Sequence, residues 1–177
     1  FQAFYPGPGL GGHCIPLDPY YLSWKAREYG FHTSMIESSM MINDRMPEYC
    51  VERASEILNR DKKALNGSMI LILGVAYKQD IDDYRESPAL AVIDLLKSEG
   101  VNVRFFDSYI PEYTRHGKAF MGEKELSSAL LAQMDLVIIT AAHSNVDYDF
   151  VQQHAKFVFD TKNAMKNVKN KTNIEIL

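Results

Sequence analysis

Four short hydrophobic runs recur along the C-terminal two thirds of the chain. They predict strands at Met69–Leu73, Val101–Phe106, Leu136–Thr140 and Phe157–Asp160. The first run, MILIL, has no polar position, which is typical of a strand buried on both faces of a parallel sheet. Because helical patterns separate the runs, right-handed βαβ units are expected. The pattern therefore predicts an α/β fold with one parallel, Rossmann-like sheet in residues 67–177.

Helix signals occupy the intervals between the predicted strands. Ser87-Pro88 is a typical pair of N-cap and first-turn residues, and the helix that follows is expected to end at Gly100. Further helices are predicted at residues 123–133 and 148–155, and a long loop with Pro111 and Gly117 is expected after the second strand.

The first third of the chain has a different pattern. Residues 1–17 are predicted to form a loop, because FYPGPGLGGHCIPL contains four glycines and three prolines. Asp18 is expected at the N-cap of a helix that ends at Gly30. A second helical tract is predicted at residues 34–65, which Pro47 should kink or divide. We therefore expect a helical part, residues 1–66, followed by an α/β domain, residues 67–177.

Composition and charge exclude several classes of protein. The 177 residues carry a net charge of -4, which argues against a nucleic-acid-binding protein. No run reaches the roughly 18 apolar residues of a membrane span, and no signal peptide is visible. Cys14 and Cys50 cannot build a disulfide framework, so a cytoplasmic location is expected. Cys50 falls on the apolar face of a predicted helix and is assigned to packing.

The Rossmann-like pattern does not by itself predict a dinucleotide site. Such a site needs the pattern G-x-G-x-x-G at the first strand-to-helix turn, where backbone meets pyrophosphate. Here Gly74 follows the first strand without a second or third glycine. Asp107 closes the second strand, where a ribose-binding acid would lie, but one acid is weak support. We therefore reject this domain as the main NAD site.

Two motifs resemble the UDP-glucose/GDP-mannose dehydrogenase family. GPGLGGHCIPLDPYYL resembles the family's loop with the catalytic cysteine, most closely in the branch that acts on UDP-N-acetylhexosamines. GVAYKQDIDDYRESPAL resembles the motif that opens the family's C-terminal domain. The chain starts without Met inside the first motif, and we interpret it as the C-terminal part of a longer enzyme, expected to be inactive alone.

The resemblance implies oxidation of the C6 alcohol of a UDP-sugar to a carboxylate, with two NAD+ reduced, for surface polysaccharide synthesis. The candidate sugars are UDP-N-acetylglucosamine, UDP-N-acetylmannosamine and UDP-glucose. The second oxidation requires an addition to the aldehyde carbonyl, and a thiolate is suited to it. Cys14 would form a thiohemiacetal and then a thioester. The start of the next helix favours the thiolate form of this cysteine.

The residues next to Cys14 have alternative interpretations. In the family, an aspartate four residues after the cysteine helps to position or deprotonate water, and Asp18 matches it. Asp18 also needs no role beyond the N-cap. His13 could favour the thiolate as a cation, although a loop histidine bonded to backbone is the preferred interpretation.

The resemblance also implies the binding residues. Substrate contacts are assigned to Tyr5, Gly7, Gly9, Gly11, Tyr77 and Lys78, and NAD contacts to Cys14 and Arg85. The alternative for the loop residues is a rigid loop that binds no ligand, and the alternative for Lys78 is a solvated surface lysine. The acids Asp80, Asp82 and Asp83 are expected to fix their loop, with no metal required. Lys162 stands where the family commonly has arginine, which would weaken a bidentate phosphate contact.

The helical part is expected to mediate a homodimer, as in the family. Its apolar and aromatic side chains exceed what a linker beside one small domain can bury. They are Tyr20, Tyr21, Trp24, Met35, Met40, Met41 and Met46. The main alternative for the chain is a non-catalytic, dimerising nucleotide-binding module. A flavodoxin-like receiver would explain the alternating strands and leave the cysteine loop unexplained.

Overall fold

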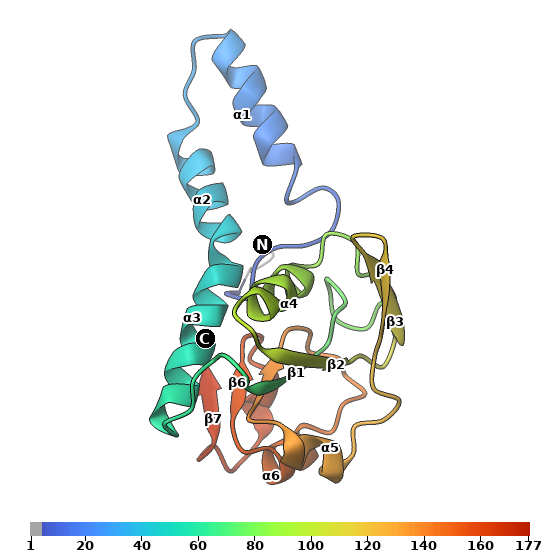
Figure 1. Ribbon diagram of the computed structural model, residues 1–177. Helices are drawn as coiled ribbons and strands as arrows, with labels where there is room; N and C mark the ends of the chain where they lie inside the picture. The colour runs from blue at the N-terminus through green and yellow to red at the C-terminus, as the bar shows by residue number, and fades with distance from the viewer. Residues whose placement is uncertain (1–4) are drawn as a thin grey trace.

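The computed structural model describes residues 5–177, in which a parallel sheet is flanked by helices (Figure 1). The elements in chain order are α1 (Asp18–Glu28), α2 (Ser34–Asp44), α3 (Met46–Arg60), β1 (Met69–Leu73), α4 (Pro88–Ser98), β2 (Asn102–Phe106), β3 (Glu112–Arg115), β4 (Lys118–Met121), α5 (Ser128–Gln133), β5 (Leu136–Ile139), α6 (Tyr148–His154), β6 (Val158–Asp160), the 3-10 helix η1 (Ala164–Asn167) and β7 (Ile174–Ile176). The strand order is β2-β1-β5-β6-β7, and every neighbouring pair is parallel. The predicted α/β class and the four predicted strands are confirmed.

Both faces of the sheet are buried, as the run MILIL predicts. Ile70 and Ile72 pack with α3 and α4 on one face, while Leu71 and Leu73 pack with α5 and α6 on the other. The alternation follows from the two-residue period of a strand. Strand order reverses between β1 and β5, so the crevice at the carboxyl ends of these strands is the usual ligand position in such a sheet.

Helices α1 and α2 extend away from the sheet domain as a hairpin (Figure 1). The predicted division at Pro47 is confirmed, because α2 ends at Asp44 and Pro47 lies in the first turn of α3. The second tract ends at Arg60, not at residue 65, since Lys62 adopts the left-handed conformation and its successor bonds back to Leu58. The predicted loop 1–17 is described from residue 5 onward and contains no helix or strand there.

The position of Asp18 differs from the prediction. Asp18 is the first residue of α1, and Leu17 occupies the N-cap without a side-chain hydrogen bond. The carbonyl of Cys14 accepts the N–H groups of Leu17 at 3.0 Å and Asp18 at 2.8 Å. The preceding turn therefore supplies the acceptor for the first helical amide, and the N-cap assignment for Asp18 is wrong by one residue.

The long loop predicted after the second strand contains the hairpin β3–β4. His116 and Gly117 both have positive φ, 50° and 73°, as a two-residue type I′ turn requires. Tyr113 and Phe120 stack across the hairpin with ring centroids 5.1 Å apart. The hairpin differs from the predicted loop, because Gly117 lies in a tight turn between two paired strands.

Two further differences lie near the C-terminus. The helix predicted at residues 123–133 is restricted to α5, because the amide of Glu123 donates to Phe105 and its carboxylate pairs with Arg104. Strand β7 was not predicted. It is joined to α3 by ion pairs from Arg53 and Arg60 to Glu175, at 2.5 and 2.7 Å.

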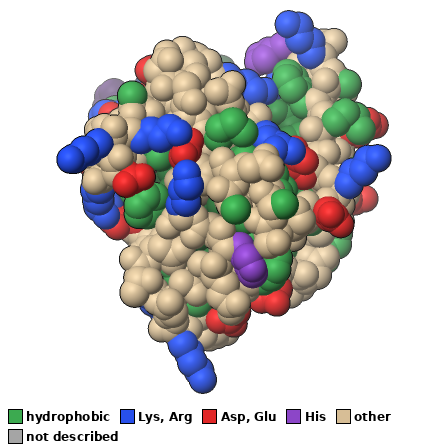
Figure 2. Space-filling view, turned by 60° about the horizontal axis from the view of Figure 1, so that its bottom comes forward, with side chains coloured by type: hydrophobic (Ala, Val, Ile, Leu, Met, Phe, Trp, Pro, Cys, Tyr) green, Lys and Arg blue, Asp and Glu red, His purple; other side chains and the backbone are tan. Residues whose placement is uncertain are grey.

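Surface charge is mixed on the face shown in Figure 2, where side chains of both signs are scattered among small hydrophobic groups. Within residues 5–177, no helix is long and apolar enough to cross a membrane.

Candidate functional site

The cysteine loop, residues 5–17, contacts the sheet domain at two segments that follow strands, the connection from β1 to α4 and the segment after β6. Gly7 contacts Lys162 after β6, Gly9 contacts Pro88 at the start of α4, and Gly11 contacts Tyr77 after β1. Because these strands are parallel, their carboxyl ends lie on one edge. The two motifs, far apart in the sequence, therefore form one continuous surface.

The contact at Gly11 leaves no room for a side chain. A β-carbon there would lie 2.6 Å from Cβ of Tyr77 and 2.8 Å from the carbonyl oxygen of Glu86. Gly12 has φ +91° and faces the Tyr77 ring, 3.0 Å from a β-carbon position. Glycine is required here for close approach and for backbone conformation. The Tyr77 ring is consequently held beneath the loop that precedes Cys14.

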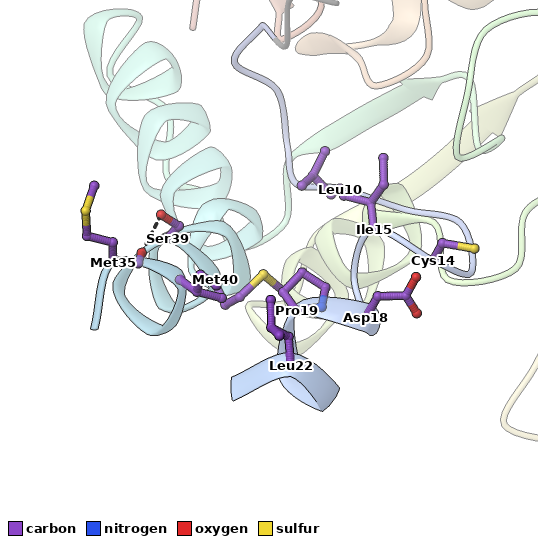
Figure 3. Close-up of a pocket in the computed structure, with 10 residues that line it drawn as sticks. Leu10, Cys14, Ile15, Asp18, Pro19, Leu22, Met35, Ser39 and Met40 are labelled. Carbon is purple, nitrogen blue, oxygen red and sulfur yellow. Dashed lines mark hydrogen bonds between the residues drawn. The ribbon is translucent and has the colours of Figure 1, made fainter. Parts of the chain in front are cut away.

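Cys14 and Asp18 lie at one side of an apolar hollow (Figure 3). Both residues are exposed, and the Cys14 thiol and the Asp18 carboxylate extend in the same direction. The backbone amide of Asp18 donates to the carbonyl of Cys14, so the two residues lie about one helical turn apart. The hollow has a volume of 690 Å³, and its opposite wall is α2. It is lined by Leu10, Cys14, Ile15, Asp18, Pro19, Leu22, Met35, Ile36, Ser39 and Met40.

Tyr77, Lys78 and Arg85 belong to the loop between β1 and α4. Tyr77 is half-buried, whereas Lys78 and Arg85 are exposed. Arg85 forms a two-point contact with Asp83, with Nε–Oδ1 at 3.0 Å and an Nη–Oδ2 distance of 2.7 Å. Hydrogen bonds from the Arg85 guanidinium and amide lower the pKa of Asp83 to about 2. The guanidinium is thus fixed at the surface.

Lys162 forms a second positively charged position on the surface. A β-carbon on Gly7 would lie 2.9 Å from its Nζ atom. Although Lys162 is exposed as a residue, desolvation of its ammonium lowers the pKa. In the part of the chain that the structure describes, no charged neighbour contributes to this shift. Such an ammonium is suited to an anionic ligand.

Lys162 lines a 580 Å³ hollow together with Tyr5, Pro6 and Lys166. The floor of the hollow is a tight turn. Asp160 accepts the amides of Lys162 and Ala164 at 3.0 Å and of Met165 at 2.7 Å. Lysine at the end of a parallel strand was the available signal for this region, but the contribution of Lys166 was not foreseen.

Asp107 occupies the position of a ribose-binding acid but is committed to the fold. Its carboxylate accepts the amides of Val75 at 2.7 Å, Ala76 at 3.0 Å and Tyr109 at 2.8 Å, and bonds to His143 at 3.1 Å. Burial alone would raise the pKa of Asp107, but His143 and the amides lower it. The carboxylate closes the turn that would hold pyrophosphate in a dinucleotide site.

The two cysteines have different environments. Cys50 is fully buried, and burial raises the pKa of its thiol to about 12, whereas Cys14 is exposed. Among residues 5–177, no group of three or more His, Cys, Asp or Glu side chains is arranged to hold a metal ion.

Comparison with known proteins gives two family matches. Residues 71–167 match the UDP binding domain of the UDP-glucose/GDP-mannose dehydrogenase family, and residues 1–45 match its central domain. The UDP-N-acetyl-D-mannosamine dehydrogenase of Methanocaldococcus jannaschii is 32% identical over 168 residues, which span 90% of this chain and 36% of that protein. The UDP-N-acetyl-D-glucosamine 6-dehydrogenase of Pseudomonas aeruginosa is 29% identical over 145 residues, or 81% and 33% of the two chains.

A solved structure agrees with these matches. The UDP-N-acetyl-mannosamine dehydrogenase Cap5O from S. aureus superimposes with a TM-score of 0.74 and 30% identity, covering 99% of this chain and 40% of that one. The chain therefore spans between a third and two fifths of the length of these relatives.

Proposed function

The chain belongs to the UDP-glucose/GDP-mannose dehydrogenase family, and we propose that its parent protein is an NAD-dependent UDP-sugar 6-dehydrogenase that acts on a UDP-N-acetylhexosamine. The relatives at 32% and 29% identity are named for UDP-N-acetyl-D-mannosamine and UDP-N-acetyl-D-glucosamine. In this proposal residues 1–66 supply the nucleophile and the dimer contact, and residues 67–177 bind the nucleotide.

The observation that carries the proposal is the contact between the cysteine loop and the strand ends. Gly7 lies against Lys162, and Gly11 lies against Tyr77. A UDP moiety on this edge would meet the ammonium groups of Lys78 and Lys162, while loop amides from residues 7–11 approach its phosphates. The sugar would then extend along the loop toward Cys14.

Cys14 is the proposed nucleophile of the second oxidation. Its thiolate adds to the C6 aldehyde and forms a thiohemiacetal, whose oxidation leaves a thioester on the sulfur. Its exposed thiol supports this role, because a substrate carbonyl can approach the sulfur from the side on which the Asp18 carboxylate also lies (Figure 3).

Asp18 is the proposed partner for hydrolysis. Its carboxylate extends to the same side as the thiol and lies in the first turn of α1, not at the N-cap, so it is available to orient or deprotonate water. Water attacks the thioester carbon, the C–S bond breaks, and the thiolate and the uronic acid are released.

NAD+, when bound, accepts the hydride in both oxidations. The residues of this chain that fit it are Cys14, at the reacting centre, and Arg85, whose exposed guanidinium is held by Asp83 and suits a phosphate. The portion of the relatives that this chain does not span would supply the remaining contacts. In residues 67–177 the amides of the turn after β1 are already taken by Asp107, so they are not free for a pyrophosphate.

The proposal includes a homodimer through α1 and α2. Trp24 is 64% exposed, Tyr21 62%, Met35 84% and Met41 61%, which is unusual for side chains of this size. Met40, by contrast, is buried, so its place in the predicted set was wrong. The two helices extend beyond the sheet domain, where a second copy can cover them (Figure 1).

The test is turnover of the full-length parent on a panel of UDP- and GDP-sugars, with NADH and uronic acid measured together. We expect about two NADH for each acid formed, with a UDP-N-acetylhexosamine as the preferred substrate. If UDP binds but no sugar is oxidised, the protein is a non-catalytic nucleotide-binding module.

A further inference from the structure

We propose that His143 is a positioning residue, which holds the loop of Tyr77 and Lys78 in its binding conformation through the backbone amide of Asp80. This inference rests on the proposed nucleotide site, since the loop matters only if it binds the nucleotide. Asp80 N–H donates to Nδ1 of His143 at 3.0 Å. His143 follows β5 and lies far from the loop in the sequence, so its role is visible only in the fold.

The loop of Tyr77 and Lys78 is closed at its base by its own backbone, and its tip at Asp80 is held by hydrogen bonds to another segment. At the base, the amide of Tyr77 donates to the carbonyl of Asp83 at 3.0 Å. At the tip, the carboxylate of Asp80 accepts the amide of Ser144 at 2.7 Å. The tip is therefore attached to the segment after β5 by two hydrogen bonds. Because β1 and β5 flank the reversal of strand order, the attachment spans the crevice where ligands bind in such sheets.

The backbone at the tip needs this attachment. Asp80 has φ +59°, and Glu86, at the far end of the loop, has φ +53°. Left-handed conformations in residues other than glycine cost energy and persist where surrounding contacts impose them. Four contacts surround Asp80: its amide donates to His143, and its carboxylate accepts the Ser144 amide, the Gln79 side-chain amide at 3.0 Å and the Tyr109 hydroxyl at 3.5 Å. Among them, the bond to His143 is the one that holds the backbone of Asp80 itself. If this bond were lost, the tip could relax and move Tyr77 and Lys78.

His143 is held in one protonation pattern. A backbone amide can only donate, so Nδ1 of His143 is the acceptor and carries no proton in this arrangement. Nε2 is then the donor to Asp107 at 3.1 Å. The ring is 1% exposed and lies 5.0 Å from the ring of Tyr109. Each ring nitrogen thus has a different task, and the two tasks can be separated by substitution.

The matched pair is His143→Asn and His143→Gln. Asn places a carbonyl oxygen near the position of Nδ1 and retains the acceptor for Asp80. Gln places an amide near the position of Nε2 and retains the donor to Asp107. Both remove the aromatic ring, and Asn is one methylene smaller than Gln, so the melting temperature of each variant is measured to report its own loss of packing.

The experiment measures two quantities in the chain and both variants: hydrogen exchange of the amides of residues 77–86, and UDP affinity by calorimetry. We expect His143→Gln to raise the hydrogen-exchange rate of these amides and to weaken UDP binding by about fivefold, because it lacks the acceptor for the Asp80 amide and one hydrogen bond is lost. We expect Asn to stay within about twofold of the unchanged chain in both. A residue with a purely structural role would change melting temperature in both variants without this split.

The outcomes separate the two proposals. If the unchanged chain does not bind UDP, the nucleotide site is overturned and the role of His143 falls with it. If UDP binds and the two variants have equal affinities, the role of His143 alone is overturned.

A second pair covers the case in which the Gln variant does not fold. Asp80 is partly exposed, so its substitution leaves the core intact. Asp80→Asn keeps an acceptor for Ser144 and tolerates the left-handed conformation, whereas Asp80→Ala does neither. If Asp80→Ala binds UDP more weakly than Asp80→Asn, the proposed role of the tip attachment is supported. If the two variants bind UDP equally, that role is overturned.

Discussion

The Nζ atom of Lys162 lies 2.9 Å from the point that a β-carbon on Gly7 would occupy. This contact joins the cysteine loop to the segment after β6 and places a cation beside Gly7 of the loop. Desolvation lowers the pKa of this ammonium. An anion at this position would give the ammonium a charged partner, and the phosphates of a UDP-sugar are such an anion.

Removing the charge at Lys162 should weaken nucleotide binding. Lys162→Met is expected to reduce UDP affinity by about 1 to 3 kcal/mol, the scale of a hydrogen bond to a charged group. Lys162→Arg keeps the charge, adds a two-point donor and should bind UDP at least as tightly. Calorimetry at two salt concentrations measures both. Lys169→Met, at another exposed lysine, is the control; equal losses in the two Met variants would contradict a specific contact.

Lys78 should contribute on a similar scale. Lys78→Ala is expected to weaken UDP binding by about 1 to 3 kcal/mol, because an exposed ammonium in the loop after β1 is lost. The matched control is Lys118→Ala, on the β3–β4 hairpin. Titration calorimetry with unchanged affinity in the Lys78 variant would remove this residue from the site.

Cys14 should be required for formation of the acid in the full-length parent. Cys14→Ser is expected to lose uronic acid production by several orders of magnitude, since the second oxidation needs a sulfur adduct. Cys50→Ala, at the buried cysteine, should retain the reaction. Product analysis by mass spectrometry decides the matter, and undiminished acid from the Ser variant would overturn the mechanism.

Asp18 should act after the thioester has formed. Asp18→Asn in the parent is expected to let an acyl-enzyme accumulate on Cys14, visible as added mass in intact-protein spectrometry. Asp18 lies in the first turn of α1 and not at its N-cap, so the expected cost to the fold is the loss of a negative charge near the helix start, about 0.3 to 1 kcal/mol. Normal steady-state turnover would leave Asp18 without a role in hydrolysis.

Asp135 should matter for stability and not for binding. Its buried carboxylate pairs with Lys63 at 2.5 Å and Lys156 at 3.2 Å and accepts the amide of Met69 at 2.8 Å. Asp135→Asn should cost about 2 to 4 kcal/mol of unfolding free energy, measured with denaturant. Asp149→Asn, at an exposed position in the first turn of α6, is the control and should cost no more than about 0.3 to 1 kcal/mol.

The same residue predicts a dependence on pH. Burial alone would raise the pKa of Asp135, but Lys63, the Met69 amide and Lys156 together lower it. A carboxyl whose pKa is lowered in the folded state stabilises the fold at pH values above its ordinary pKa of about 4. This contribution is lost as the pH falls toward the pKa of the folded state. Denaturant unfolding across that acidic range should show that the unfolding free energy of Asp135→Asn falls less with decreasing pH than that of the unchanged chain. Equal losses would contradict the assignment.

The hydrophobic pattern was a good guide to the sheet and a poor one to irregular structure. MILIL and the other three runs predicted the parallel strands, because burial on both faces excludes polar residues. The β3–β4 hairpin was missed, since its turn uses His116 where Asn or Asp is usual. Strand β7 was missed because three residues at the sheet edge carry little pattern.

The sequence by itself determined the parallel sheet, the break at Pro47 and the presence of a cysteine loop beside a helix start. These are local properties, fixed by side-chain periodicity and by the backbone limits of glycine and proline. The tertiary structure decided which distant residues meet: Lys162 with Gly7, His143 with Asp80, and Asp107 with the turn after β1. Such contacts depend on strand order and on how loops cross the sheet edge, and neither leaves a periodic trace in the chain.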